Sequence, residues 1–428
     1  MGKKNKKMKR LVIIFFGVLS LVLTIGIAVM IIYAGYTKQN SDEKRNIVFF
    51  EWLEPVKESL TGKKNQSENS DIQEENTQDA KSLYGKENEK LYNEAVALGQ
   101  NVRLAECVNE DRVMFAFAGD ILLDDNYAIM SNFRARGSSI EDTFSQYLLD
   151  TMRSSDVCMV NNEFTFTERG IALKDKSFTF RANPQNVEIL KQLGVDVVSL
   201  ANNHAYDFGE VSLLDTMDTL KNADISYVGA GRNLNEAKKP TYIVANGMKI
   251  AIVSATQIER IASPDTKEAT ENSAGVLRCW DTTALLSVIG EAENNSDFTI
   301  LYIHWGTENE EDIDWLQEEQ APIYVNAGVD LIIGDHPHCL QKIDIISGVP
   351  VCYSLGNFWF NSKTLNTCMI EAGIDKEGLK SLRFIPCIQS DCRTRQLEGY
   401  AKDELLQYMR SISPDILIDD EGYIQLEK

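Results

Sequence analysis

The feature that most constrains this chain is a series of short apolar runs separated by amphipathic stretches. Several of the runs are continuous and rich in β-branched residues, as in strands that are buried on both faces of a sheet. The stretches at 183–194 and 209–224 have helical spacing, and the first is framed by Asn183–Pro184 and Gly194, which fit helix ends. The alternation predicts an α/β domain with large buried sheets. The runs are 113–118, 157–160, 195–200, 249–255, 298–303, 329–334 and 350–356.

Polar side chains of the kind that bind metal ions follow six of these runs. The chain has only 4 histidines, and every one of them stands in such a position. Carboxyl ends of strands gather ligands in α/β sheets, so we expect these side chains to converge. Carboxylate, amide and imidazole donors together suit one or two divalent ions such as Mn, Fe or Zn. The residues are Asp120, Glu163, Asn203 with His204, His304, His336 with His338, and Asn357.

His336 and His338 are separated by one residue. If the segment continues as an extended strand, both side chains share one face. We therefore expect the pair to point into the site from a strand. Cysteine gives no comparable signal, because the 8 cysteines include no CxxC pair of the type found in zinc ribbons. The even number of cysteines allows disulfides, but the sequence does not show which cysteines would pair.

The N-terminal part predicts a membrane anchor. Residues 1–10 carry six Lys or Arg, and residues 11–36 carry no charge, which is enough length to cross a bilayer as a helix. The basic end favours a cytoplasmic N-terminus, so a single-pass protein with its main domain outside is expected. Residues 37–110 are largely polar and are interpreted as an extracytoplasmic stalk, with a helix near 86–102 leading into the domain.

The net charge of −21 excludes one class of partner. With 43 Lys and Arg against 64 Asp and Glu, the chain is a poor ligand for nucleic acid. It would also repel an anionic polymer, unless a local cationic centre such as a bound metal ion intervened.

Eight motifs between about 113 and 360 occur in an order that resembles the bacterial capsule-synthesis family of CapA type, which makes poly-gamma-glutamate. This family resembles a branch of the calcineurin-like metallophosphoesterase superfamily. The motifs are FAGDILLDD, NNEFTFT, FTFRANP, SLANNHAYDFG, YVGAG, IHWGTEN, GDHPHCLQ and YSLGNFWF.

The resemblance implies a four-layer α/β/β/α sandwich over 111–390, followed by a C-terminal extension at 391–428. It also implies a two-metal site, which can clamp both the attacking and the leaving oxygen. Asp120 and His338 would bind the first metal, Glu163 would bridge, and Asn203, His304 and His336 would bind the second. His204 would stand beside the site as a general acid or an oxyanion donor. Arg181 is a candidate contact for an anionic substrate.

One departure from the superfamily pattern concerns the first metal. Phosphoesterases of this superfamily open with Asp-x-His, whereas this chain has Asp120-Ile121-Leu122. The histidine ligand is therefore absent, and Asp124 or Asp125 is left as a possible substitute.

Three functions remain open from the sequence. The first is a membrane-anchored metal-dependent hydrolase that acts on an extracellular anionic polymer such as poly-gamma-glutamate. The second is an assembly or export scaffold that holds polymer or other membrane proteins of capsule synthesis. The third is an extracellular phosphoesterase. His204 and the ligands of the second metal favour an enzyme, whereas the missing histidine favours the scaffold.

Overall fold

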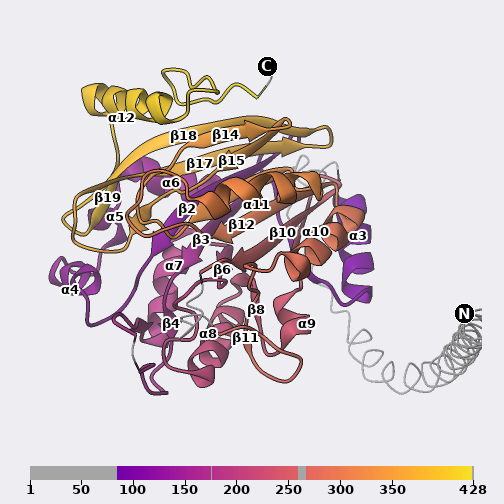
Figure 1. The fold of residues 1–428 in the computed structure, drawn as a ribbon, viewed down its shortest axis with the longest axis horizontal. Helices are drawn as coiled ribbons and strands as arrows, with labels where there is room; N and C mark the ends of the chain where they lie inside the picture. Colours follow the sequence, from indigo (N-terminus) through magenta and orange to yellow (C-terminus); the bar gives the residue numbers. More distant parts are fainter. Residues whose placement is uncertain (1–83, 175, 259–266, 427–428) are drawn as a thin grey trace, which may run out of the picture. The chain divides into compact units, whose positions relative to one another are not determined.

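A computed structural model describes residues 84–174, 176–258 and 267–426. The predicted cytoplasmic tail, membrane anchor and most of the stalk lie outside these residues. Within the described part of the chain, no helix combines the length and the apolar character needed to cross a membrane. The described residues form a mixed α/β fold with two large sheets, which confirms the predicted class (Figure 1).

The first large sheet has seven strands and carries the segments of the later sequence motifs. Its central strands β10, β12, β13 and β15 are parallel to one another. β9 is antiparallel to β10 and parallel to β1, and β14 is antiparallel to β15. In spatial order the strands are β1 (Asn101–Leu104), β9 (Thr241–Ala245), β10 (Met248–Thr256), β12 (Phe298–His304), β13 (Leu331–Asp335), β15 (Val349–Cys352) and β14 (Ile343–Ile346).

The second large sheet has eight strands. Its strands β2, β3, β6 and β7 are parallel, and β17, β18 and β19 extend it with antiparallel pairing. The order is β19 (Arg393–Gln396), β18 (Gly378–Ser390), β17 (Leu365–Asp375), β2 (Val113–Ile121), β3 (Val157–Asn162), β6 (Val197–Ser199) and β7 (Ser226–Val228), with β16 (Asn357–Trp359) also paired to β2. Two small pairs join β4 (Thr165–Phe166) to β5 (Arg181–Ala182) and β8 (Ala230–Gly231) to β11 (Gly275–Val276).

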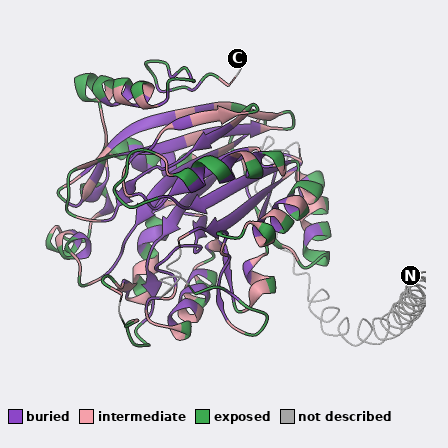
Figure 2. Cartoon of the chain, viewed as in Figure 1, coloured by how far each residue is buried: buried purple, intermediate pink, exposed green. Residues whose placement is uncertain are grey.

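Three buried hydrophobic cores hold the elements together. Successive side chains of a strand point to opposite faces of its sheet, so one strand contributes to two cores. On β2, Phe115 and Phe117 enter a core that also takes side chains from the seven-stranded sheet, including Ile300. Ala116 and Ala118 enter a second core on the opposite face, with side chains from α4 to α8. The third core joins the outer face of the seven-stranded sheet to α10 and α11. The strands are therefore mostly buried, while the helices expose one face (Figure 2).

The helix expected at 183–194 begins and ends where the sequence predicts it. Asn183 accepts a hydrogen bond from the backbone of Gln185 ahead of α7, and Gly194 ends that helix in the left-handed conformation. The helices are α3 (Gly85–Ala97), α4 (Ala128–Ala135), α5 (Ile140–Thr143), α6 (Gln146–Ser154), the 3-10 turn η2 (Pro184–Asn186), α7 (Val187–Leu193), α8 (Glu210–Asn222), α9 (Leu234–Ala237), α10 (Thr283–Asn295), α11 (Trp315–Asn326) and α12 (Gly399–Ile412).

The C-terminal residues and the cysteines complete the fold. β19 pairs with β18, and the buried side chains of α12 and of the segment after it join the core between the sheets. All 8 cysteines are described and all are free thiols, so no disulfide contributes to the fold.

The parallel strands bring the polar motif residues to one edge of both sheets. Asp120 lies at the end of β2, Glu163 follows β3, and His304 ends β12. The register between adjacent strands determines which residues lie side by side. Asp120 is paired with Asn357 of β16, and His304 is paired with Asp335 of β13. The two sheets thus contribute from opposite sides to one group of buried side chains.

Gly119 is predicted to be essential for this convergence. A Cβ atom at Gly119 would lie 2.0 Å from the backbone oxygen of Gly356, which cannot move aside without displacing β16. We expect Gly119→Ala to lower the free energy of unfolding by about 1–3 kcal/mol or more, the usual cost of overpacking. Gly290→Ala in α10 is the control, because its Cβ meets nothing within 4 Å. Urea unfolding should show the control unchanged or slightly stabilised, and equal effects would contradict the prediction.

Candidate metal centre

Two groups of buried or half-buried side chains that could each hold a metal ion share the carboxylate of Glu163. One group joins Glu163 with His304 and His336, and the other joins it with Asp120 and His338. Within each group the potential ligand atoms all lie within 4.8 Å of one another. The structure therefore brings together the five residues that offer a carboxylate or an imidazole, with Glu163 in the shared position.

Glu163 shows most directly that these residues fit a cation. Its side chain is fully buried, and neither carboxylate oxygen has a hydrogen-bond partner among the described residues. Burial is the largest cause that raises the pKa of Glu163, and the nearby carboxyl groups of Asp120 and Asp335 raise it further. A buried carboxylate without a partner is costly, and a divalent cation between the two groups would compensate it.

The side chains expected to hold the second metal, those of His304, His336 and Asn203, lie together. The Nε2 atom of His304 lies 2.8 Å from Oδ1 of Asn203 and 3.0 Å from Nδ1 of His336. Nε2 also lies 3.7 Å from a carboxylate oxygen of Glu163. Burial lowers the pKa of His304 to about 3 and holds that of His336 well below its usual value. Both imidazoles are therefore neutral near pH 7 and have a lone pair available for a metal.

The side chains expected to hold the first metal, those of Asp120 and His338, are also in contact. Nδ1 of His338 lies 3.0 Å from Oδ2 of Asp120 and 2.8 Å from Oδ1 of Asn357. Oδ1 of Asp120 accepts a hydrogen bond of 2.9 Å from Asn161, whose own oxygen accepts one from Asn202. Burial lowers the pKa of His338, but the hydrogen bond and the charge of Asp120 outweigh it, so the net shift is upward.

Asp335 was not predicted from the sequence as a site residue, yet it forms a third potential metal-holding group with Asp120 and His304. Its Oδ1 atom lies 2.8 Å from Nδ1 of His304, on the side of the ring away from Asn203. A carboxylate in this place fixes the tautomer and the orientation of a metal-binding histidine. The signal in the sequence was the aspartate directly before His336, at the end of the run 329–334.

His204 lies beside the two groups and is paired with Asp207. Its Nδ1 atom is 2.7 Å from a carboxylate oxygen of Asp207, and its Nε2 atom is 3.9 Å from Glu163. Lys176 contacts the other oxygen of Asp207 at 2.5 Å, and the ring of Phe180 packs at 4.3 Å from the ring of His204. Burial is the largest cause that lowers the pKa of His204. A neutral ring that donates Nδ1–H to Asp207 presents an unprotonated Nε2 towards the site.

The expected strand geometry of His336 and His338 is wrong. β13 ends at Asp335, and both histidines lie in the bend that follows, with φ of +96° and +59° respectively. Positive φ is unfavourable for a residue with a side chain and is found mainly where a functional site is held in place by its surroundings. The two imidazoles reach different metal positions because the backbone turns between them.

The substitutes proposed for the missing histidine are engaged elsewhere. Asp124 accepts hydrogen bonds from the backbone of Asn126 and Arg181, and Asp125 forms an ion pair of 2.6 Å with Arg134. Leu122 occupies the position of the missing histidine and is buried. Asn357 is the nearest additional group, and its Nδ2 atom is buried without a partner among the described residues.

Arg181 is not brought to the two groups. Its guanidinium lies 4.4 Å from the centre of the Phe208 ring. It lines neither of the two cavities that open beside the buried cluster. Its role as a substrate contact stays a prediction.

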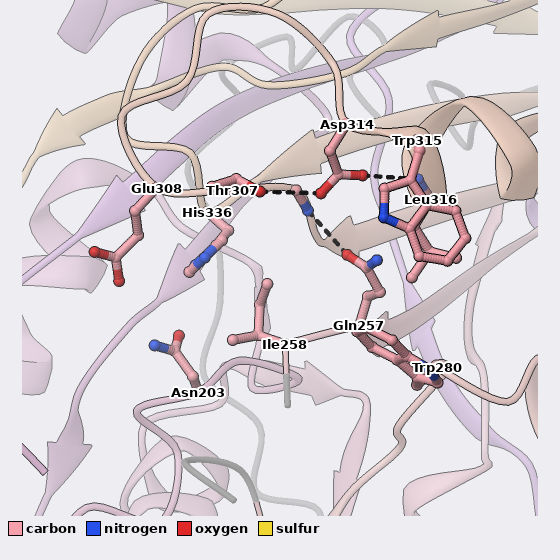
Figure 3. A pocket seen from close by; sticks show the side chains of 11 residues that line it. Asn203, Gln257, Ile258, Trp280, Thr307, Glu308, Asp314, Trp315, Leu316 and His336 are labelled. Atoms are coloured by element: carbon pink, nitrogen blue, oxygen red, sulfur yellow. Dashed lines mark hydrogen bonds between the residues drawn. The ribbon is translucent and has the colours of Figure 1, made fainter. Parts of the chain in front are cut away.

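Two cavities reach the buried cluster from different sides, and Glu308 lines both of them. The first, of about 390 Å³, includes Asn203 and His336 and is drawn in Figure 3. The second, of about 310 Å³, includes His204 and His338. Each metal position is thus accessible from its own cavity.

Metal binding is expected to release protons from Glu163. Its raised pKa means that this carboxyl keeps its proton to a higher pH than an ordinary glutamic acid, whereas a bound cation requires the carboxylate. Metal affinity should therefore fall as the pH is lowered. Calorimetric titration with Mn²⁺ in two buffers of different ionisation enthalpy counts the protons, and binding without proton release would contradict the assignment.

The titration of the Glu163 carboxyl can also be tested in the metal-free chain. Since the folded pKa of Glu163 is raised, its protonated form stabilises the fold at low pH, and this contribution is lost as the pH rises above the unfolded value of 4.5. In EDTA, the wild-type chain should lose more stability than Glu163→Gln does as the pH rises above 4.5. Equal losses would show that Glu163 does not titrate in this way.

Comparison with known proteins agrees with the motifs. The sequence model described as "Bacterial capsule synthesis protein PGA_cap" matches residues 114–362, more than half of the chain. The chain belongs to the PGA_cap family. The matched range contains Asp120, Glu163 and the four histidines, so the buried cluster lies within the part that defines PGA_cap membership.

Two relatives carry names that refer to capsule or PGA synthesis. The "PGA biosynthesis protein CapA" of Bacillus subtilis (strain 168) is 30% identical over 283 residues, covering 65% of this chain and 72% of that protein. The "Capsule biosynthesis protein CapA" of Bacillus anthracis is 33% identical over 219 residues, covering 50% of this chain and 52% of that protein. The match thus spans about half of the second relative.

A solved structure, TT1561 of Thermus thermophilus, is also similar to part of the chain. It covers 63% of this chain and 97% of its own at 9% identity, with a TM-score of 0.34. That score is too low to support a conclusion.

Proposed function

We propose that this protein is a membrane-anchored, extracytoplasmic metal-dependent hydrolase that acts in the synthesis, export or processing of a capsular anionic polymer such as poly-gamma-glutamate. The observation that carries the hydrolase part is the pair of metal-type groups that share the unpartnered carboxylate of Glu163, with His204 and Asp207 beside them. The names of the PGA_cap relatives support the polymer.

The fold assignment within this proposal is a four-layer α/β/β/α sandwich of metallophosphoesterase type. It is supported by the three cores, of which one lies between the two sheets and two lie between a sheet and its helices. It is also supported by the position of the cluster at the carboxyl ends of parallel strands from both sheets.

The residues of the cluster have distinct roles in the proposed chemistry. Divalent ions bound there would supply positive charge that polarises the scissile group and offsets the charge of an anionic substrate. His204 takes up a proton at Nε2 and, once protonated, can deliver it to a leaving group. Asp207 orients the ring of His204 and stabilises its protonated form, while Asp335 orients His304.

A scaffold for capsule assembly is the second candidate. The observation that favours it is Leu122, an apolar side chain in the position where Asp-x-His enzymes have a ligand. Without this ligand the first position would bind its metal ion less tightly, and a mechanism that needs two metal ions would be less effective. In that case the cluster would stabilise the fold, and polymer or partner membrane proteins would bind elsewhere.

Complementation separates the two candidates. A strain that lacks the protein is supplied with wild type, with His204→Ala, or with His336→Ala, and its polymer is quantified. The hydrolase proposal predicts that both variants fail while the chain accumulates at the wild-type level. Full polymer output from His204→Ala would show that catalysis is not the physiological role.

Membrane anchoring through residues 11–36 is part of the proposal and rests on the sequence. The basic residues 1–10 support a cytoplasmic N-terminus. A C-terminal alkaline phosphatase fusion, which is active only outside the cytoplasm, should therefore be active. A signal from a C-terminal reporter that functions only in the cytoplasm would contradict this topology.

A further inference from the structure

The cavity that opens beside Asn203 and His336 has an aromatic end that the proposed metal chemistry does not use. In the view of Figure 3, Trp280 and Trp315 lie on the side away from Asn203 and Glu308, and Gln257 lies between the two sides. The volume of about 390 Å³ falls in the range of sites that bind small molecules.

Both indole rings are unusually exposed. The exposed fractions are 43% for Trp280 and 64% for Trp315, although three other described aromatic side chains of this region, Trp305, Tyr324 and Tyr353, are buried. Trp315 is the first residue of α11, and the capping box between Asp314 and Gln317 fixes the backbone there. A large apolar surface held rigidly at a cavity is typical of a binding site rather than of solvent-exposed surface.

The polar lining of the cavity selects against anions. Its charged side chains are the carboxylates of Glu308 and Asp314, and no Lys or Arg is among the described residues that line it. Gln257 is 3% exposed, and its Oε1 accepts a hydrogen bond of 3.0 Å from the backbone of Gly306. This fixes the amide so that its Nε2 group, which has no partner among the described residues, is available to a ligand.

The aromatic faces and the polar side chains of the cavity together fit a neutral sugar ring. Flat aromatic faces pack against the C–H groups of a sugar ring, while amide and carboxylate groups at the side bond to its hydroxyls. A free carboxylate or phosphate would be repelled by Glu308 and Asp314 unless it lay at the metal position. The second cavity differs, because Lys363 lines it and can accept an anionic group.

We propose that the cavity between Trp280 and Trp315 binds a neutral sugar ring of the substrate. This deepens the proposed function, on which it rests: the scissile group of the anionic polymer lies at the metal centre, and a neutral glycosyl part joined to that polymer packs on the indoles. The anionic part of the polymer, such as a run of glutamates, lies outside this cavity.

The test measures sugar binding without catalysis. Ligand-observed NMR titrations use the full-length protein in detergent and EDTA, with neutral tetrasaccharides of glucose, galactose and N-acetylglucosamine, and with tetra-gamma-glutamate. At least one sugar should bind saturably. Trp315→Ala and Trp280→Ala should each raise its Kd about tenfold, which corresponds to the loss of one good aromatic contact.

Two matched variants control for general effects of removing an exposed aromatic side chain. Tyr400→Ala on α12 (77% exposed) and Phe178→Ala in the second cavity (60% exposed) should leave the Kd within about twofold. Failure of all three sugars to bind, equal effects of all four variants, or tetra-gamma-glutamate binding that depends on Trp315 would each overturn the proposal. Because EDTA removes the metal, these outcomes are independent of whether the centre hydrolyses anything.

Discussion

Replacing His204 with alanine is expected to lower the metal-dependent turnover of a phosphodiester by about 100-fold or more, the usual effect of losing a general acid or base. The ring lies within reach of the shared ligand Glu163 at 3.9 Å, yet it is held through Nδ1 by Asp207 rather than by the metal-type groups. It also lines the second cavity, so Nε2 can contact a reacting group. The measurement is kcat on bis(p-nitrophenyl) phosphate, with metal content determined on the same samples.

Asp207→Asn provides the matched test of how His204 acts. The amide keeps the shape of the side chain but cannot stabilise a protonated imidazole as a carboxylate does, so turnover should fall while metal content stays unchanged. The pH profile should change as well, because Asp207 raises the pKa of His204 against the lowering effect of burial. Turnover by His204→Ala close to that of the wild type would refute a catalytic role for this residue.

Removal of Glu163 should have the largest effect on metal-dependent stability. Glu163→Ala takes a ligand from both groups at once, whereas His336→Ala and His338→Ala each take a ligand from one. A ligand at 100 times its Kd stabilises a folded protein by about 2.7 kcal/mol. We expect Glu163→Ala to lose all of the rise in melting temperature that Mn²⁺ or Zn²⁺ produces, and each histidine variant to lose part of it.

The double variant His336→Ala with His338→Ala tests the coupling of the two positions. Because both positions share Glu163, its loss should differ from the sum of the two single losses. Asp335→Asn should lower metal affinity less than His336→Ala if Asp335 acts through the hydrogen bond of its Oδ1 to His304. An equal or larger loss would make Asp335 a ligand, in the group that it forms with Asp120 and His304. A response to metal that Glu163→Ala leaves intact would contradict the shared position.

The sequence predicted the fold class and the convergence of the site because both depend on local patterns. Continuous apolar runs marked the strands, and the polar residue after each run marked its carboxyl end. Asn183 and Gly194 marked the ends of a helix through the chemistry of their own backbones. The carboxyl ends of parallel strands lie at one edge of a sheet, so Asp120, Glu163 and His304 could be expected near one another without knowing the order of the strands. Their roles as metal ligands stay a prediction.

Other features of the site depend on geometry that the pattern does not carry. The strand expected at His336 and His338 is a bend with positive φ, and only the surroundings of the two residues impose it. The role of Asp335 follows from its register with His304 across two parallel strands. The engagement of Asp124 with the backbone of Arg181 is equally a long-range contact, so the sequence left it open as a ligand.

The most direct test of the metal centre is the metal content of the purified full-length chain. The protein is exposed to Mn²⁺, Fe²⁺ or Zn²⁺, dialysed to remove free ions and measured by inductively coupled plasma mass spectrometry, with Glu163→Ala treated in the same way. The two groups that share Glu163 predict one or two tightly bound ions per wild-type chain and a loss of bound metal in the variant. A wild-type chain that retains no ion above background, or a Glu163→Ala chain that retains as much as the wild type, would contradict the account.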